Sequence, residues 1–310
     1  MQRRLITKFT TTILFSTVVA VAQGPPINTN TAFVTGLNGS AIRTFGKAIQ
    51  KTTLFSGARV VSNDSDRAAS AFAFPVMIPY EVIPNKLLVI AAVPYLSKEM
   101  ELTKNGNRVS RDISGWGDLK LLGKYQLYQR DRKRATLRIT FLGGIKLPTG
   151  KDDASDDRGP LPRPLQLGSG SVDVLGGPII TYVKNRIGLN AEVSYRKNTQ
   201  AKGYQFGDVW SANLAMGYRI YPRVYKTYPS PYSSVFVELL SEFSGKDRKG
   251  GIEQEHTGKQ ILVLSPGVQF VLSRTFLLET SLQVPLYQYY NGEQLGVDYA
   301  YTFGLRWLIF

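Results

Sequence analysis

The chain of 310 residues contains no cysteine. Without a thiol it cannot form disulfide bonds, hold a metal through thiolates or carry a lipid on a cysteine that follows an export signal. The absence is compatible with an oxidising periplasm, where a stray thiol is a liability. Thiol chemistry is therefore excluded from every function considered for this chain.

Long hydrophobic runs are also missing after residue 22. The best candidates are residues 87–96, interrupted by Pro94, and residues 261–272, interrupted by Ser265 and Pro266. A transmembrane helix needs about 20 consecutive and predominantly apolar residues. The sequence therefore predicts no transmembrane helix, although an exported chain can also cross a membrane as a closed β-barrel.

Acidic residues are scarce relative to basic ones. The chain has 23 Asp and Glu against 38 Lys and Arg, which gives a formal net charge of +15. The basic residues are spread along the chain, and the one dense cluster, RDRKR at residues 130–134, is short enough to be a turn. We therefore expect no nucleic-acid binding, whereas a membrane surface with acidic lipids is compatible with this charge.

The first 22 residues have the organisation of a secretory signal peptide. Arg3, Arg4 and Lys8 form a positive start, an apolar stretch follows at residues 9–19, and Ala-Val-Ala at residues 20–22 fits a small-x-small cleavage site. The apolar stretch is too short for a membrane anchor, and the alternative is a buried N-terminal helix. We expect the mature chain to begin directly after this site.

Alternation of apolar and polar residues with a period of two, which is typical of β-strands, recurs along the rest of the chain. Residues 135–147 and the aromatic C-terminal segment show it clearly, and the aromatics there are of the kind found where lipid meets water. Most segments have about 10–14 residues, enough for a tilted strand to cross a bilayer. Together they predict twelve strands, at residues 44–55, 71–80, 86–96, 117–129, 134–147, 170–183, 186–197, 208–221, 232–243, 259–272, 275–287 and 299–310.

The connections between these segments alternate between long and short. The short ones lie at residues 81–85, 130–133, 184–185 and 273–274, and residues 222–231 are an exception among them. Long loops on one side, tight turns on the other and an even strand count are expected of an antiparallel outer-membrane barrel with both termini periplasmic. The sequence therefore favours an all-β transmembrane barrel over the alternative, an exported soluble all-β protein.

Four stretches carry a family resemblance. They are GWGDLKLLGKY at residues 115–125, GGIKLPTGKDD at 143–153, LQLGSGSVD at 165–173 and FGDVWSANLAMGYR at 206–219. In this order they resemble the outer-membrane barrels of the MetA-pathway of phenol degradation family over roughly residues 70–310. The resemblance implies a barrel that passes solutes and supplies no catalytic residues.

The same motifs also have a structural interpretation. Gly117 and Gly207 each follow a long loop and permit an unusual backbone conformation, and the adjacent Asp118 and Asp208 can accept hydrogen bonds from free backbone donors. Pro148 ends a strand because it cannot extend the hydrogen-bond ladder. We therefore expect these motifs to organise the ends of strands.

Catalytic and metal-binding patterns are weak. The sole histidine, His256, lies in a loop without the His-x-Ser-Asn-Gly pattern that an outer-membrane phospholipase carries, so we expect no enzyme activity. Clustered carboxylates at residues 152–157 could attract calcium, but their spacing is not that of an EF-hand, so we expect a solvated external loop and no cofactor. The basic loop at residues 245–251 could meet lipopolysaccharide phosphates.

The faces opposite the lipid predict a set of charged pore-lining residues. The second and third strands are apolar on both faces, so one wall of the lumen would face either a hydrophobic solute or the N-terminal segment folded inside. Charges inside a barrel can also merely cross-link it. The predicted pore-lining residues are Lys120, Lys124, Arg138, Lys146, Glu192, Arg196, Arg219, Glu238, Glu279 and Arg306.

The sequence thus predicts a signal peptide at residues 1–22, a periplasmic or lumen segment at 23–43 and a barrel of the bacterial outer membrane at 44–310. The predicted function is a channel or transporter for small, hydrophobic or aromatic solutes. The alternative is a non-conducting barrel that serves as a scaffold or surface interaction module. Expected partners are outer-membrane lipids, lipopolysaccharide, small solutes and the barrel assembly machinery, which would read the terminal Phe310.

Overall fold

The computed structural model describes residues 25–34, 41–224, 230–273 and 276–308, with the side chains of residues 41–43 and 306–308 excepted. The predicted signal peptide and the terminal Phe310 lie outside the described residues. Within them, no helix is both long and apolar enough to span a bilayer.

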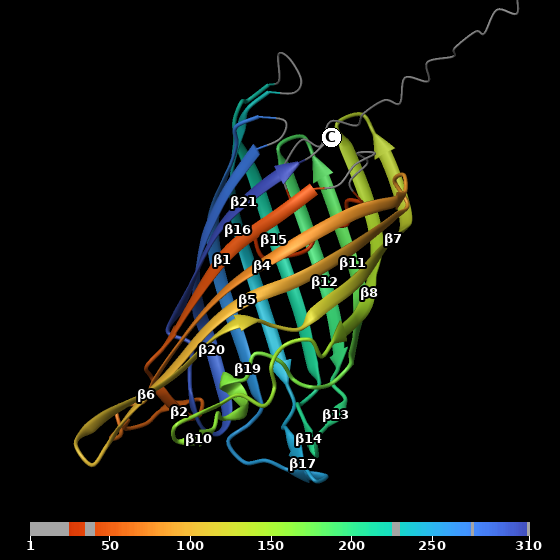
Figure 1. Ribbon diagram of the computed structural model, residues 1–310. Helices are drawn as coiled ribbons and strands as arrows, with labels where there is room; N and C mark the ends of the chain where they lie inside the picture. Colours follow the sequence, from red (N-terminus) through yellow and green to blue (C-terminus); the bar gives the residue numbers. More distant parts are fainter. Residues whose placement is uncertain (1–24, 35–40, 225–229, 274–275, 309–310) are drawn as a thin grey trace, which may run out of the picture.

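Twelve antiparallel strands close into a barrel, as the alternating pattern predicts (Figure 1). Each strand pairs with its neighbours along the chain, and the last strand pairs with the first, with Ala48 opposite Tyr301. Closure leaves no strand edge with unpaired backbone groups. A bilayer requires this because its core has no water to form hydrogen bonds with such groups. The barrel strands are β1 (Ala41–Lys51), β4 (Ala68–Ile83), β5 (Leu87–Lys104), β7 (Leu119–Arg132), β8 (Ala135–Leu147), β11 (Asp173–Lys184), β12 (Ile187–Lys197), β15 (Val209–Tyr221), β16 (Tyr232–Ser244), β19 (Lys259–Val271), β20 (Phe276–Leu295) and β21 (Tyr299–Leu308).

The short elements gather at one end of the barrel, the lower end in Figure 1, whereas the end of the described chain lies at the other. The end with the long loops is the extracellular one, and the end with the tight turns, where β1 begins and β21 ends, is the periplasmic one. The short elements are β2 (Leu54–Gly57), β3 (Arg59–Val60), β6 (Asn107–Trp116), β9 (Ser155–Asp156), β10 (Gly159–Pro160), the 3₁₀ turn η1 (Arg163–Leu165), β13 (Gln200–Ala201), β14 (Tyr204–Gln205), β17 (Arg248–Lys249) and β18 (Ile252–Glu253).

Three predicted boundaries are wrong. The first strand and the barrel begin at Ala41, and residues 54–57 form the separate strand β2, which pairs with β20. The predicted loop at residues 97–116 is largely a hairpin of β5 and β6, and the loop predicted at 288–298 is mostly the end of β20. These extensions project beyond the bilayer, where lipid no longer selects apolar residues for one face, so no continuous apolar face marks them in the sequence.

Strand residues alternate between an exposed outer face and a buried inner face. In β12 the side chains of Leu189 and Val193 are each 45% exposed, whereas those of Asn190 and Glu192 are 7% and 6% exposed. The apolar residues therefore face outward to lipid and the polar ones inward, the reverse of a soluble protein. This alternation is the signature of a transmembrane barrel.

Candidate functional site in the barrel lumen

Residues 25–34 lie inside the barrel, where side chains of several strands hold their backbone. Gln269 on β19 donates a hydrogen bond of 3.0 Å to the Pro25 carbonyl, and Lys124 on β7 donates one of 2.8 Å to the Thr31 carbonyl. The Ala32 N–H donates to Thr181 Oγ1 on β11 at 2.7 Å. The segment therefore crosses the lumen instead of following one wall.

The carboxylate of Glu238 on β16 is the main anchor of this segment. It accepts the backbone N–H groups of Ile27, Asn28 and Thr29 at 3.1, 3.0 and 2.7 Å. The Glu238 side chain is 0% exposed. A buried carboxylate is costly unless donors surround it, and three consecutive backbone donors meet that need.

Asn28 is bound through its side chain from β19 and β20. Its Nδ2 donates to Ser265 Oγ and Ser281 Oγ, both at 3.0 Å, and its Oδ1 accepts a hydrogen bond of 2.8 Å from Gln283. Two residues further on, Asn30 donates from its backbone and its side chain to Glu192 on β12, at 3.1 and 2.7 Å. These contacts fix which residue of the segment faces which part of the wall.

The second half of the segment packs on apolar side chains. Val34 contacts Leu88 and Ile90 on β5, and Ala32 contacts Leu142 and Ile179. Leu142 is the one large apolar residue on the inner face of β8, and its contact with Ala32 explains why it is not polar. The segment thus covers part of the apolar inner wall.

The predicted pore-lining residues fall into groups by what they touch. Lys124, Glu192 and Glu238 bind the segment, and the Arg138 guanidinium lies 5.0 Å from the centre of the Phe33 ring. Lys120 and Arg196 are partly buried, and the side chain of Arg306 lies outside the described residues. The seven that are at least nine-tenths buried are Lys124, Arg138, Lys146, Glu192, Arg219, Glu238 and Glu279.

Lys146 belongs to a network that joins three of the sequence motifs at the extracellular end. Its ammonium group pairs with Asp118 at 3.2 Å and with Asp173. The Asp118 carboxylate also accepts the backbone N–H groups of Gly150 and Ser169, each at 3.0 Å. The interpretation that this aspartate satisfies loop donors is confirmed, and the network fixes the loop of residues 148–172 to the barrel.

The second Gly-Asp pair has the same role. The Asn198 N–H donates to Asp208 at 3.0 Å, and the Tyr195 hydroxyl and the Lys197 ammonium donate to it at 2.6 and 2.8 Å. Partial burial alone would raise the pKa of Asp208, but the donors from Lys197 and Tyr195 hold it below its usual value. Asp208 is therefore an ionised anchor for the loop before β15.

Sequence reasoning missed several basic residues of the inner face. Lys47 and Lys51 alternate inward on β1, with Lys47 opposite the buried Thr302, and Lys98 on β5 donates to the Gln166 carbonyl at 2.6 Å. Lys259 on β19 pairs with Glu242 at 2.8 Å. The two lysines in FGKAIQK have period-two spacing and lie within the first predicted strand, residues 44–55, so alternation could have found them.

The remaining candidates have structural roles at the extracellular end. The Glu293 N–H donates to His256 Nδ1 at 2.8 Å. Asp152 pairs with Lys202 at 2.8 Å, and Asp156 pairs with Arg111 at 2.7 Å, which holds the pKa of Asp156 below its usual value. Within the described part of the chain, no three His, Asp or Glu side chains form a group that could hold a metal.

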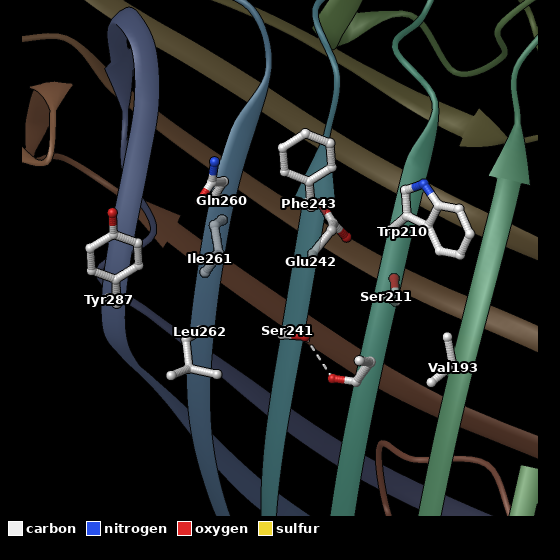
Figure 2. Close-up of a pocket in the computed structure, with 11 residues that line it drawn as sticks. Val193, Trp210, Ser211, Ser241, Glu242, Phe243, Gln260, Ile261, Leu262 and Tyr287 are labelled. Atoms are coloured by element: carbon white, nitrogen blue, oxygen red, sulfur yellow. Dashed lines mark hydrogen bonds between the residues drawn. The ribbon is translucent and has the colours of Figure 1, made fainter.

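A hollow of about 300 Å³ lies on the outer face of the barrel, across β12 to β20. Figure 2 shows Trp210, Phe243 and Tyr287 around the smaller Ser241, which donates to the Ala212 carbonyl at 2.7 Å. The three aromatic side chains are 47–51% exposed and belong to the lipid-facing set. The hollow therefore faces the hydrocarbon of the membrane and is separate from the lumen.

Comparison with known proteins agrees with this architecture. The sequence pattern of the family described as "Putative MetA-pathway of phenol degradation" matches residues 52–303. No curated protein matches the chain. The fold is similar to that of the COG4313 outer membrane channel from Pseudomonas putida F1, with a TM-score of 0.67 and 13% identity over 92% of this chain and 100% of that one. The beta domain of the Bordetella autotransporter BrkA matches with a TM-score of 0.49 and 10% identity, over 88% of this chain and 100% of that one.

Proposed function

Because the chain belongs to the MetA-pathway of phenol degradation family, we propose that it is an outer-membrane channel for small hydrophobic solutes, aromatic ones included. The observation that carries the proposal is the lumen. A short segment crosses it, held by hydrogen bonds and apolar contacts, beside an apolar stretch of inner wall. Such an arrangement can open without unfolding the barrel.

The apolar stretch lies on β4 and β5. Leu88, Ile90 and Ala92 are 4–8% exposed on the inner face of β5, and Met77 packs with them against Val34. A channel for hydrophilic solutes has polar walls that replace water around its cargo. An apolar inner wall instead favours a solute that gains free energy by leaving water.

In the proposed closed state residues 25–34 are bound, and releasing the segment should require only a moderate free energy. Each hydrogen bond to Glu238 or Glu192 contributes roughly 1.5–3 kcal/mol, because one partner is charged. Water that entered the lumen would satisfy the same carboxylates and recover much of that free energy. An open minor state separated by a few kcal/mol is therefore accessible, and a solute that prefers it would shift the equilibrium.

We propose transport rather than catalysis as the function. The Nδ1 atom of His256 is occupied by a backbone donor, and the inner-face carboxylates Glu192 and Glu238 bind the segment. None of these groups is paired with a nucleophile in the way that hydrolytic catalysis requires. The family resemblance supports the same reading.

Planar-bilayer recordings would test the proposal. We expect small or rare current steps from the wild-type protein and large, frequent ones from a variant that lacks residues 25–34. A barrel that folds, as judged by heat-modifiable migration on a gel, yet never conducts in either form would contradict the channel and favour the scaffold alternative.

A further inference from the structure

Four basic side chains gather around one carboxylate in the extracellular half of the lumen. Lys47 and Lys51 on β1, Arg196 on β12 and Lys259 on β19 form what we call the basic lumen cluster, with Glu242 on β16 among them. Glu242 interacts electrostatically with Lys47, Arg196 and Lys259, and Lys51 interacts with Lys259 and Glu242.

The strand register explains how these residues come together. Arg196 lies opposite Val209, Val209 opposite Ser244 and Ser244 opposite Lys259, so Arg196 and Lys259 share one row around the wall. Glu242 lies two positions from Ser244 on the same face. The register therefore places Arg196, Glu242 and Lys259 close together on the inner wall.

The cluster has more positive charge than its own carboxylate can neutralise. Among the side chains that the structure describes, only that of Lys259 pairs with Glu242, at 2.8 Å. Within the described residues, no carboxylate lies within 4.0 Å of the ammonium groups of Lys47 or Lys51, and Arg196 Nε is buried without a hydrogen-bond partner. Like charges in a narrow lumen repel one another, which raises the free energy of the empty cluster. A bound anion lowers that repulsion.

The cluster is also accessible from within the lumen. The side chains of Glu242 and Lys259 are 44% and 31% exposed although both strand positions face inward. Glu238, four residues earlier on the same face of β16, is 0% exposed because residues 25–34 cover it. Open space at the cluster thus lies directly on the extracellular side of the segment.

Apolar side chains lie between and beside the cations. Ile49 lies between Lys47 and Lys51 on the inner face of β1, and Leu240 lies opposite Val263 on the inner faces of β16 and β19. A strongly hydrated inorganic anion would gain nothing from these neighbours. An organic anion with an apolar body would bury that body against them.

We propose that the basic lumen cluster binds the carboxylate of an amphipathic organic acid, with its aromatic or aliphatic body against Ile49, Leu240 and Val263. The proposal rests on the proposed channel function and narrows its solutes to apolar acids. The acid would wait at this site until residues 25–34 move aside.

Titration calorimetry of the wild-type protein in lipid nanodiscs tests the inference, with 4-phenylbutyrate and 4-phenylbutanol as probes and empty nanodiscs as blanks. We expect the carboxylate to bind at least about tenfold more tightly than the alcohol, since charge-assisted contacts are stronger than neutral ones. Lys47→Gln combined with Lys51→Gln should remove that preference and leave the affinity for the alcohol unchanged. Lys47→Arg with Lys51→Arg should retain it.

A double variant at the two ends of the barrel, Lys133→Gln in the turn between β7 and β8 with Lys249→Gln in β17, is the matched control because it removes two exposed charges. Unchanged carboxylate affinity in the Lys47 and Lys51 glutamine variant overturns the inference. The inference is also overturned if that variant loses the same affinity for phenylbutyrate and for phenylbutanol. Displacement of phenylbutyrate from the wild-type protein by an equal concentration of sulfate would overturn it as well. If the variant lacking residues 25–34 conducts while these tests fail, only this inference is lost and the channel function stands.

Discussion

At the residue scale, Glu238 shows what alternation can predict and what it cannot. The period of two places Glu238 on the inner face, and its burial agrees. Its partners lie 209–211 positions away in the sequence, in a segment without regular secondary structure. No local pattern links two such stretches, so the sequence could predict the face of this carboxylate but not its role.

We predict that Glu238→Gln releases residues 25–34. An amide offers one neutral acceptor in place of two charged ones, so the closed state should lose about 2 kcal/mol. Because the chain has no cysteine, Thr31→Cys introduces a unique label site. A water-soluble maleimide should modify that site more than about tenfold faster in the Glu238→Gln background. In the control background Glu293→Gln, which alters an exposed carboxylate, the rate should not change.

A second residue-scale prediction concerns the two faces of β15. Leu214 is 57% exposed to lipid, whereas Ser211 faces the lumen opposite Glu242. Leu214→Arg should destabilise the barrel by about 2–4 kcal/mol, because the bilayer midplane rejects arginine. Ser211→Arg should cost far less in the same denaturant titration, and equal losses would contradict the assigned faces.

The lumen segment limits which inward-facing positions can serve as the control for such an arginine substitution. The inner face of β8 offers Thr140, which alternation alone predicts to be tolerant. Its side chain is 0% exposed and its hydroxyl has no hydrogen-bond partner among the described residues. Arginine would not fit there. A sequence pattern reports the direction of a side chain but not the space in front of it.

At the scale of elements, strands inside the bilayer were predictable and their extensions were not. The twelve barrel strands follow from alternation because lipid selects apolar residues for one face. The hairpin of β5 and β6 stands outside the bilayer, where lipid selects neither face and where Met100 and Ile113 pack against a buried cluster that includes the distant loop residue Leu165. Its turn at Asn105 and Gly106 is the clearest local signal. Both residues have positive φ, as an Asn-Gly hairpin turn requires.

The network around Asp118 gives a prediction at this scale. Asp118→Ala removes the acceptor for the Gly150 and Ser169 N–H groups and one of two carboxylates from Lys146. The loop of residues 148–172 should then open more often, and trypsin should cut it faster after the exposed Lys151 and Arg158.

The matched control for that experiment is Asp64→Ala, which changes an exposed aspartate in another extracellular loop. Its cleavage pattern should match that of the wild type. Global unfolding of the Asp118→Ala barrel should stay nearly unchanged, because the loop lies outside the membrane-spanning strands. Equal digestion of the two variants would show that Asp118 does not hold the loop.

At the scale of the whole molecule, charge is distributed unevenly along the lumen. On the extracellular side of the segment, seven basic side chains of the described residues face inward or into the mouth, against three acidic ones, Asp118, Asp173 and Glu242. The basic ones are Lys47, Lys51, Lys98, Lys120, Lys146, Arg196 and Lys259. At the depth where residues 25–34 are bound, the inner wall carries two basic residues, Lys124 and Arg138, and two acidic ones, Glu192 and Glu238. The charges of these four residues cancel.

This distribution predicts that the open pore prefers anions. In a bilayer with a salt gradient, the variant lacking residues 25–34 should show a reversal potential of the sign given by anion permeation. The preference should weaken between 0.1 M and 1 M salt, because the Debye length falls from about 10 Å to about 3 Å. Adding Lys120→Gln and Lys51→Gln should reduce it further without unfolding the barrel. A cation-selective pore would contradict this prediction and would show that the extracellular half of the lumen does not control permeation. The electric field in the pore would then be set by four acidic inner-face residues, Glu81, Glu192, Glu238 and Glu279.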